Sequence, residues 1–331
     1  MIGRPQGRRT RAREAMTGYL FISPWLVGFA VFVFGPMLAS LYLSFTRYDP
    51  SAVHGSIQWL GLQNYTRLFS SDPLFWHSLW VTFHYSIVSI PLQMAGGLAL
   101  ALLLNQKVRG IGLYRAAFYL PVVLGGVATS LIWMWLFSPS QGLINTGLAA
   151  LFDFLGTESA ATRTLSGALT FLFGSADGGL LPGWIASEQG ALNALILMSL
   201  WGLGGSMIVN LAGLQSIPGV YYEAAEIDGA GPFTRFFRIT LPLLSPTILF
   251  NLVMGIIGSF QVFAQGYIMT EGGPNNATRF YVLYVYQNAF TYFQMGYASA
   301  LAWVLFVIIL ALTAFVLGTS RGWVFYEAQK R

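Results

Sequence analysis

The chain has 331 residues, and its composition excludes an ordinary soluble protein: 9% of the residues are charged and 55% are hydrophobic. Globular proteins carry about 25% charged residues, so a soluble fold could not cover its surface with so few. The apolar content also excludes intrinsic disorder, and the absence of cysteine excludes disulfides and thiolate metal sites.

Six long stretches without Asp, Glu, Lys or Arg predict an all-α integral membrane protein with six transmembrane helices. A helix needs about 20 apolar residues to cross a bilayer, whereas barrel strands would alternate apolar and polar residues. The apolar cores predict spans, in chain order, at 19–45, 81–104, 114–137, 191–211, 241–263 and 298–318. They form one transmembrane domain over 18–318, between a basic N-terminal segment, 1–17, and a C-terminal segment, 319–331.

The basic residues predict the orientation of these spans. Of the 17 lysines and arginines, all but Arg47, Arg67, Arg163 and Arg279 fall on the side of the two termini. Cytoplasmic loops carry the excess of Lys and Arg, so both termini are predicted to be cytoplasmic. The isoelectric point near 9.5 is then explained by the basic cytoplasmic loops and termini, and no nucleic-acid partner is expected.

The spans lack the residues that would drive transport or catalysis. Apart from Arg115, one residue inside the cytoplasmic end of the predicted span 114–137, no predicted span contains Asp, Glu, Lys or Arg, which argues against proton coupling and against a membrane-embedded acid–base enzyme. A phosphate-binding loop needs a lysine after a glycine-rich turn, and neither Lys107 nor Lys330 has that setting. We therefore expect no catalytic residue, cofactor or metal in this chain, and any ATP hydrolysis must take place in a separate subunit.

The loop between the fourth and fifth spans, 217–242, is the most informative segment. Pro218 precedes a predicted short helix, Gly229 lies in the turn that ends it, and Pro232 suits the first position of a second helix. The paired alanines, Ala224 and Ala225, would give a smooth face that another protein can approach. Glu223 would offer a carboxylate to an arginine of that partner.

The spacing in this loop resembles the EAA signature of the transmembrane subunits of ABC importers. Glu-Ala-Ala is followed after three residues by Gly, and after nine more by Ile-x-Leu-Pro. The matching positions are Glu223, Ala224, Ala225, Gly229, Ile239, Leu241 and Pro242, and Asp228 fits the common Asp-Gly-Ala form. Shorter matches such as Gly272-Gly273-Pro274 make the carbohydrate-uptake branch, of maltose, oligosaccharide and glycerol-phosphate type, the most similar.

This resemblance implies a permease subunit of a binding-protein-dependent sugar importer in a bacterial-type inner membrane. Its expected partners are a second homologous permease, a dimer of ATP-binding subunits that hold ATP and Mg, an extracytoplasmic solute-binding protein, a sugar substrate and the lipid bilayer. The loop around Glu223 would be the coupling helix seated on the ATPase. The sequence departs from the family at Ala264, where many relatives have an acid, and in a longer outward loop, 138–190.

The family places its substrate path mainly around the fourth and fifth spans. Sugars are bound by aromatic faces and by neutral amides and hydroxyls, although small and polar residues in membranes often only pack helices. The candidate path residues are Trp201, Ser206, Asn251, Ser259, Gln261 and Gln265, with Ser259 and Gln261 as the leading pair. The scarcity of Lys and Arg in the predicted spans favours a neutral solute. A glycerol phosphate or other polar solute, or a self-contained secondary carrier, remains the alternative.

Overall fold

The computed structural model describes residues 8–50, 57–106, 108–175 and 178–325, and side chains from Met16 onward. These residues are almost entirely helical, which confirms the predicted all-α fold. In chain order the helices are α1 (Arg8–Phe29), α2 (Gly35–Ser44), α3 (Gln63–Ser70), α4 (Pro73–Leu104), α5 (Ile111–Val123), α6 (Gly126–Leu136), α7 (Leu143–Leu155), α8 (Ala160–Phe173), α9 (Ala191–Ser199), α10 (Leu203–Ser216), α11 (Val220–Ile227), α12 (Pro232–Arg235), α13 (Leu241–Phe260), α14 (Ala264–Met269), α15 (Tyr281–Tyr286) and α16 (Met295–Ser320). Within the described residues β1 (Thr46–Arg47) pairs antiparallel with β2 (Gln58–Trp59).

Five segments of the described chain are long and apolar enough to cross a membrane: Met16–Ser44, Pro73–Leu104, Ala191–Ser216, Pro232–Met269 and Met295–Ser320. Each overlaps one of the predicted spans. A sixth candidate is the pair α5 and α6, which covers the predicted span 114–137 but is bent by 97°. Five or six candidate spans agree with the predicted membrane fold.

The predicted third span is therefore not one continuous helix. Leu124 and Gly125 are extended, with ψ of 125° and 152°, and they separate α5 from α6. Pro121, in the last turn of α5, has no N–H to continue the helical hydrogen-bond series. Gly125 then acts as the N-cap of α6. This bend creates the concave surface described in the next section.

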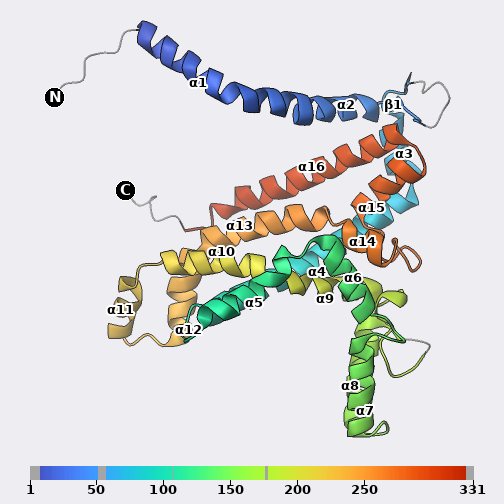
Figure 1. The fold of residues 1–331 in the computed structure, drawn as a ribbon, viewed down its shortest axis with the longest axis vertical. Helices are drawn as coiled ribbons and strands as arrows, with labels where there is room; N and C mark the ends of the chain where they lie inside the picture. Colours follow the sequence, from blue (N-terminus) through green and yellow to red (C-terminus); the bar gives the residue numbers. More distant parts are fainter. Residues whose placement is uncertain (1–7, 51–56, 107, 176–177, 326–331) are drawn as a thin grey trace. The chain divides into compact units, whose positions relative to one another are not determined.

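The described residues divide into two compact units, the first comprising residues up to Ser71 with Tyr286–Trp303, and the second Asp72–Val285 with Val304 onward. In the second unit α4 lies at the centre and packs against α9, α10 and α13, while α5 packs on α10 (Figure 1). One core joins Ala101 of α4 with Met207 of α10 and Leu244 of α13. Small residues permit this close packing, as expected in a membrane where no hydrophobic effect draws helices together.

The second unit has another core near the start of α4. Val81 and Tyr85 of α4 pack there with residues of α9, with Phe137 and with Phe280. α4 begins eight residues before the predicted span because Asp72 caps it, accepting hydrogen bonds from the N–H groups of residues 74 and 75. Outside the spans, burial raises the pKa of the Tyr281 hydroxyl above its usual range.

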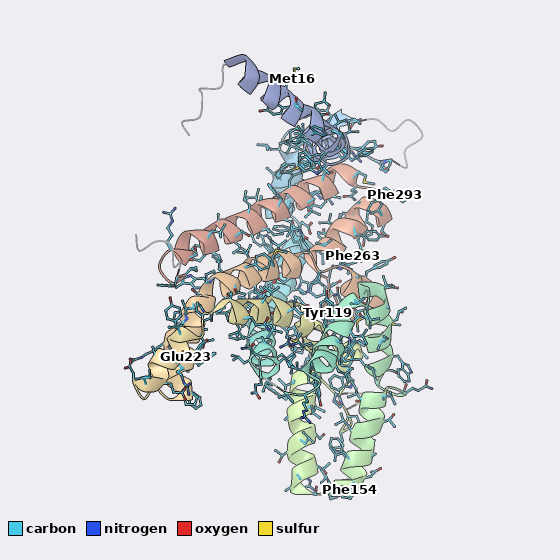
Figure 2. The ribbon with its side chains drawn as sticks, turned by 60° about the vertical axis from the view of Figure 1, so that its left-hand side comes forward. Met16, Tyr119, Phe154, Glu223, Phe263 and Phe293 are labelled. Carbon is cyan, nitrogen blue, oxygen red and sulfur yellow. The ribbon has the colours of Figure 1, made fainter. Side chains whose placement is uncertain are left out.

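The long loop 138–190 folds into an antiparallel hairpin of α7 and α8, which runs across the direction of α10 (Figure 1). Asn145 holds its base: its Nδ2 donates to the carbonyls of Pro139 and Pro182, both at 3.0 Å. Its Oδ1 accepts from Trp184 Nε1 at 2.7 Å. The hairpin tip at Phe154 is highly exposed (Figure 2). The segment predicted only as an enlarged loop thus contains two helices among its described residues.

The first unit contains the N-terminal span and the loop that follows it. Within this unit no residue from Met16 to Ala39 is buried, although the segment is strongly apolar. After the span, β1 and β2 pair Thr46 with Trp59. Asn64 of α3 closes the loop, donating from Nδ2 to the carbonyls of Ser44 at 2.8 Å and Thr46 at 2.9 Å.

Candidate coupling loop and substrate pathway

The loop between α10 and α13 forms the expected helix–turn–helix. Pro218 separates α10 from α11, and Pro232 lies in the first turn of α12. Between them Gly229 adopts a φ of 74°, which favours glycine, and the Ala230 N–H donates to the Ala225 carbonyl at 2.8 Å. The two short helices lie at the opposite end of α10 from the α7–α8 hairpin (Figure 1).

The sequence predicted that both alanines of the motif lie on the exposed face of α11, but only one of them does. Glu223 and Ala224 are exposed, whereas Ala225 is buried, at 9% exposure, beneath the turn. The larger apolar side chains on this surface are Ile227, 88% exposed, and Phe233, 82% exposed. Sequence reasoning missed these two residues, although large apolar residues in a loop between spans were the available signal. An acid beside bare apolar side chains is suited to contact with another protein.

Residues next to the motif positions join α11 to the segment that leads into the following span. The Tyr222 hydroxyl lies 2.9 Å from Thr240 Oγ1, which joins α11 to the π-helical turn Phe236–Thr240. Glu226 and Arg235 form an ion pair at 3.6 Å. The remaining motif residues have structural positions: exposed Asp228 is the C-cap of α11, and half-buried Ile239, Leu241 and Pro242 lie where α13 begins. A displacement of α11 would therefore be passed to α13.

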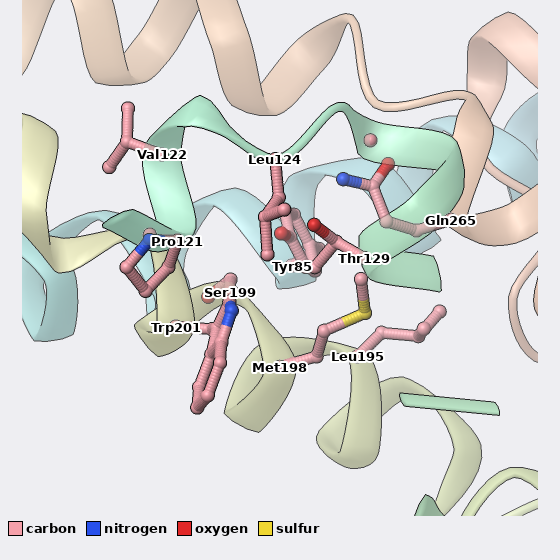
Figure 3. A pocket seen from close by; sticks show the side chains of 12 residues that line it. Tyr85, Pro121, Val122, Leu124, Thr129, Leu195, Met198, Ser199, Trp201 and Gln265 are labelled. Carbon is pink, nitrogen blue, oxygen red and sulfur yellow. The ribbon is translucent and has the colours of Figure 1, made fainter. Parts of the chain in front are cut away.

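The bend between α5 and α6 opens a pocket of about 220 Å³ within the second unit (Figure 3). Trp201 and Gln265, two of the six predicted path residues, line it together. Trp201 is 44% exposed and packs edge-on against Trp133, with ring centroids 5.7 Å apart. An aromatic face beside an amide is the combination that binds a sugar ring.

Three further polar side chains line this pocket: Tyr85 of α4, Thr129 of α6 and Ser199 of α9 (Figure 3). Sequence reasoning did not single them out. Nothing in the sequence distinguishes them from other polar residues in spans, because they face the pocket only as a result of the α5–α6 bend. Together they give the pocket hydroxyl groups that could meet a polar solute.

The other predicted path residues lie elsewhere. Asn251 Nδ2 donates to Asn210 Oδ1 at 3.0 Å, and Asn210 Nδ2 donates to Ser206 Oγ at 3.3 Å. This chain joins α10 and α13, so Ser206 and Asn251 have a packing role in the structure. Ser259 is buried and donates to the Ile256 carbonyl of its own helix at 3.2 Å, and Gln261 is exposed at the C-cap of α13. The leading pair does not line the pocket.

The described residues contain no cluster of three or more His, Asp or Glu that could hold a metal ion. The site is therefore characterised by aromatic, amide and hydroxyl groups on the pathway side and by an acid with apolar neighbours on the loop. Binding and mechanical coupling are the functions that such groups can support.

Comparison with known proteins places the chain among transport proteins. Residues 97–321 match the family described as "Binding-protein-dependent transport system inner membrane component". The chain is 42% identical over 325 residues to the probable ABC transporter permease protein YesP of Bacillus subtilis, covering 97% of this chain and 96% of that protein. It is 33% identical over 317 residues to the trehalose/maltose transport system permease protein MalF of Thermococcus litoralis, covering 95% and 96%.

Solved structures show the same fold. The chain superposes with a TM-score of 0.74 and 20% identity on a chain from the bacterial alginate ABC transporter in complex with an alginate pentasaccharide-bound periplasmic protein. The match covers 96% of this chain and 98% of that one.

Proposed function

Because the chain belongs to the family of inner membrane components of binding-protein-dependent transport systems, we propose that it is the membrane-spanning permease subunit of an ATP-driven sugar or oligosaccharide importer. It is a multi-pass membrane protein and forms half of the translocation pathway. The sugar class is supported by relatives whose names specify trehalose, maltose and arabinooligosaccharides. The glycerol-phosphate and secondary-carrier alternatives have no comparable support.

The observation that carries this proposal is the exposed Glu223 on α11, in a loop that the Tyr222–Thr240 contact joins to the π-helical turn preceding α13. We propose that an arginine of the ATPase pairs with Glu223 while Ile227 and Phe233 enter a cleft around it. ATP and Mg bind to that separate ATPase dimer, and this chain holds no cofactor and has no catalytic role. ATP-dependent movement of α11 would then be transmitted through α13 to the pathway.

The remaining partners follow from the same function. A solute-binding protein delivers sugar at the outward loops, and a second permease completes the pathway. The unburied apolar surface of Met16–Ala39 supports burial against lipid and a second subunit, since such a surface would not face water. With the positive residues inside, both termini and the α11 loop are cytoplasmic.

Reconstitution tests the function directly. Liposomes containing this chain, its partner permease and the ATPase should take up maltotriose or another oligosaccharide from its binding protein only when ATP is present inside the vesicles. Liposomes containing this chain alone should show no ATP-driven uptake. Solute movement by the chain alone, without ATP, would instead identify a secondary carrier.

The coupling role is tested by Glu223→Lys. Reversing the charge removes the acceptor for the arginine and repels it, and hydrogen bonds to charged groups contribute about 1.5–3 kcal/mol. Transport-coupled ATP hydrolysis should fall at least about tenfold while the protein still inserts and assembles. Glu158→Lys, at another exposed acid, in the distant α7–α8 hairpin, is the control. Unchanged coupling in Glu223→Lys would refute the role.

A further inference from the structure

A second pocket, of about 500 Å³, lies in the first unit. The loop between the first two spans and the segment just before and within the start of α16 form it. Among the residues that the structure describes, its lining combines two arginines, Arg47 and Arg67, with one acid, Asp49, three amide side chains and four aromatic rings. None of these residues belongs to the pathway pocket or the coupling loop.

Arg67 is held in place at this pocket by uncharged groups. Its Nη1 donates to Gln294 Oε1 at 3.0 Å, and its Cζ lies 4.4 Å from the ring centroid of Tyr297. The hydrogen bond and the ring contact described for this guanidinium are thus both with uncharged groups. Such a preorganised, planar cation matches a carboxylate well.

Hydrogen bonds and close backbone contacts hold the walls of the pocket in place. Asn64 ties α3 to the strand residue Thr46, and Gly296 lies against the Thr46 carbonyl with no space for a side chain. Tyr292 and Phe293 expose 50% and 44% of their surfaces beside the amides. Phe293 has a φ of 55°, a conformation that bulky residues rarely adopt, and a strained backbone of this kind often holds a ligand-contacting side chain.

We propose that this pocket binds a sugar unit that carries a carboxylate. Exposed rings can pack on the C–H face of the sugar, amides can meet its hydroxyls, and Arg67 with Arg47 can hold its carboxylate. Two arginines exceed the single acid, so the acidic sugar is favoured over a neutral one. The volume lies within the usual range for small-molecule pockets, about 300–1,000 Å³.

The site would receive solute on the outward side. It is formed by loops predicted to face away from the cytoplasm, so it would be accessible to an oligosaccharide that arrives from outside. This assignment rests on the proposed function, because only an importer of saccharides would present such a site to its substrate. The earlier argument for a neutral solute concerns the spans and does not extend to this loop pocket.

The test is direct binding to the purified complex of both permeases and the ATPase, in nanodiscs and without the solute-binding protein. Trigalacturonic acid and maltotriose are the acidic and neutral probes, and saturation-transfer NMR reports their contact with the protein. Trigalacturonic acid should bind several-fold more tightly than maltotriose. Arg67→Gln should weaken trigalacturonic acid at least about tenfold, because a charge-assisted pair is lost.

Gln294→Glu provides a second variant that preserves shape. Its carboxylate would occupy Arg67, so trigalacturonic acid binding should fall while maltotriose binding stays unchanged. Arg163→Gln, which removes an exposed arginine on α8, is the matched control and should bind both probes as the wild type does. Assembly and ATP hydrolysis of each variant confirm that it is folded.

Three results would overturn the proposal: equal binding of the two probes, unchanged trigalacturonic acid binding in Arg67→Gln, or variants that lose only affinity for the solute-binding protein. The last would make the pocket a protein-docking surface. Each of these can occur while ATP-driven uptake remains intact, so the pocket and the proposed function fail separately.

Discussion

At the scale of single residues, polar side chains in the spans have two different roles. Trp201 and Gln265 face an open pocket, whereas Asn210 and Asn251 bond to each other between helices. Residue type does not separate these roles, because amides and hydroxyls serve both purposes in a membrane. The direction in which each side chain points decides which of the two roles it has. That direction depends on how its helix is rotated relative to the neighbouring helices.

The pathway role of the pocket is tested at its aromatic ring. Trp201→Ala removes the face on which a sugar could pack, and aromatic contacts of this kind contribute about 0.5–1.5 kcal/mol. ATP-driven uptake at low solute concentration should fall about 2- to 10-fold in reconstituted vesicles. Trp135→Ala is the control, because Trp135 is 54% exposed and does not line the pocket. Equal losses in both variants would count against a pathway role.

The packing role of the amide pair is tested by a double-mutant cycle. Asn251→Leu leaves Asn210 Oδ1 without its donor and should lower the free energy of unfolding by about 0.6–1.7 kcal/mol in mixed micelles. Combining it with Asn210→Leu should cost less than the sum of the single changes, because no amide is then left unpaired. Ser259→Ala should cost little, since its hydroxyl bonds only its own helix. Strict additivity would show that the two amides are not coupled.

At the scale of elements, glycines set how closely the helices approach. A side chain at Gly204 of α10 would collide with the Phe118 backbone carbonyl of α5, whereas one at Gly205 would meet nothing nearer than Val122, at 4.0 Å. In the sequence the two glycines are adjacent and look equivalent. Only the packing of α5 on α10 shows which of the two is required.

This difference predicts opposite outcomes for two neighbouring substitutions. Gly204→Ala should destabilise the protein by about 1–3 kcal/mol, because the backbone of α5 must move to admit the methyl group. Gly205→Ala should be neutral or slightly stabilising, since alanine favours a helix and has space. Thermal unfolding in detergent measures both. A similar effect of the two substitutions would contradict the packing seen between α5 and α10.

At the scale of the whole molecule, the predicted orientation places the α7–α8 hairpin outside the cell and the α11 loop inside. These elements lie at opposite ends of α10 (Figure 1), as a helix that crosses the membrane requires. The absolute direction stays a prediction that rests on the distribution of basic residues.

Because the chain contains no cysteine, single cysteines can report the sidedness without further changes. Glu158→Cys in the hairpin loop and Glu226→Cys in α11 form a matched pair, since both side chains are largely exposed. A membrane-impermeant maleimide should label residue 158 in spheroplasts, and residue 226 only after the membrane is opened. The reverse pattern would place the termini outside.

The sequence by itself determined the membrane fold, the approximate positions of the spans and the helix–turn–helix of the coupling motif. These features depend only on local sequence: the length of a segment without charged residues, and the residues that start and end a helix. The tertiary structure decided the rest. In the structure the third span is interrupted at Leu124, and Ala225 is buried. Trp201 and Gln265 line one pocket, whereas Ser259 does not. Such choices depend on contacts between helices distant in sequence, and composition and spacing carry no information about those contacts.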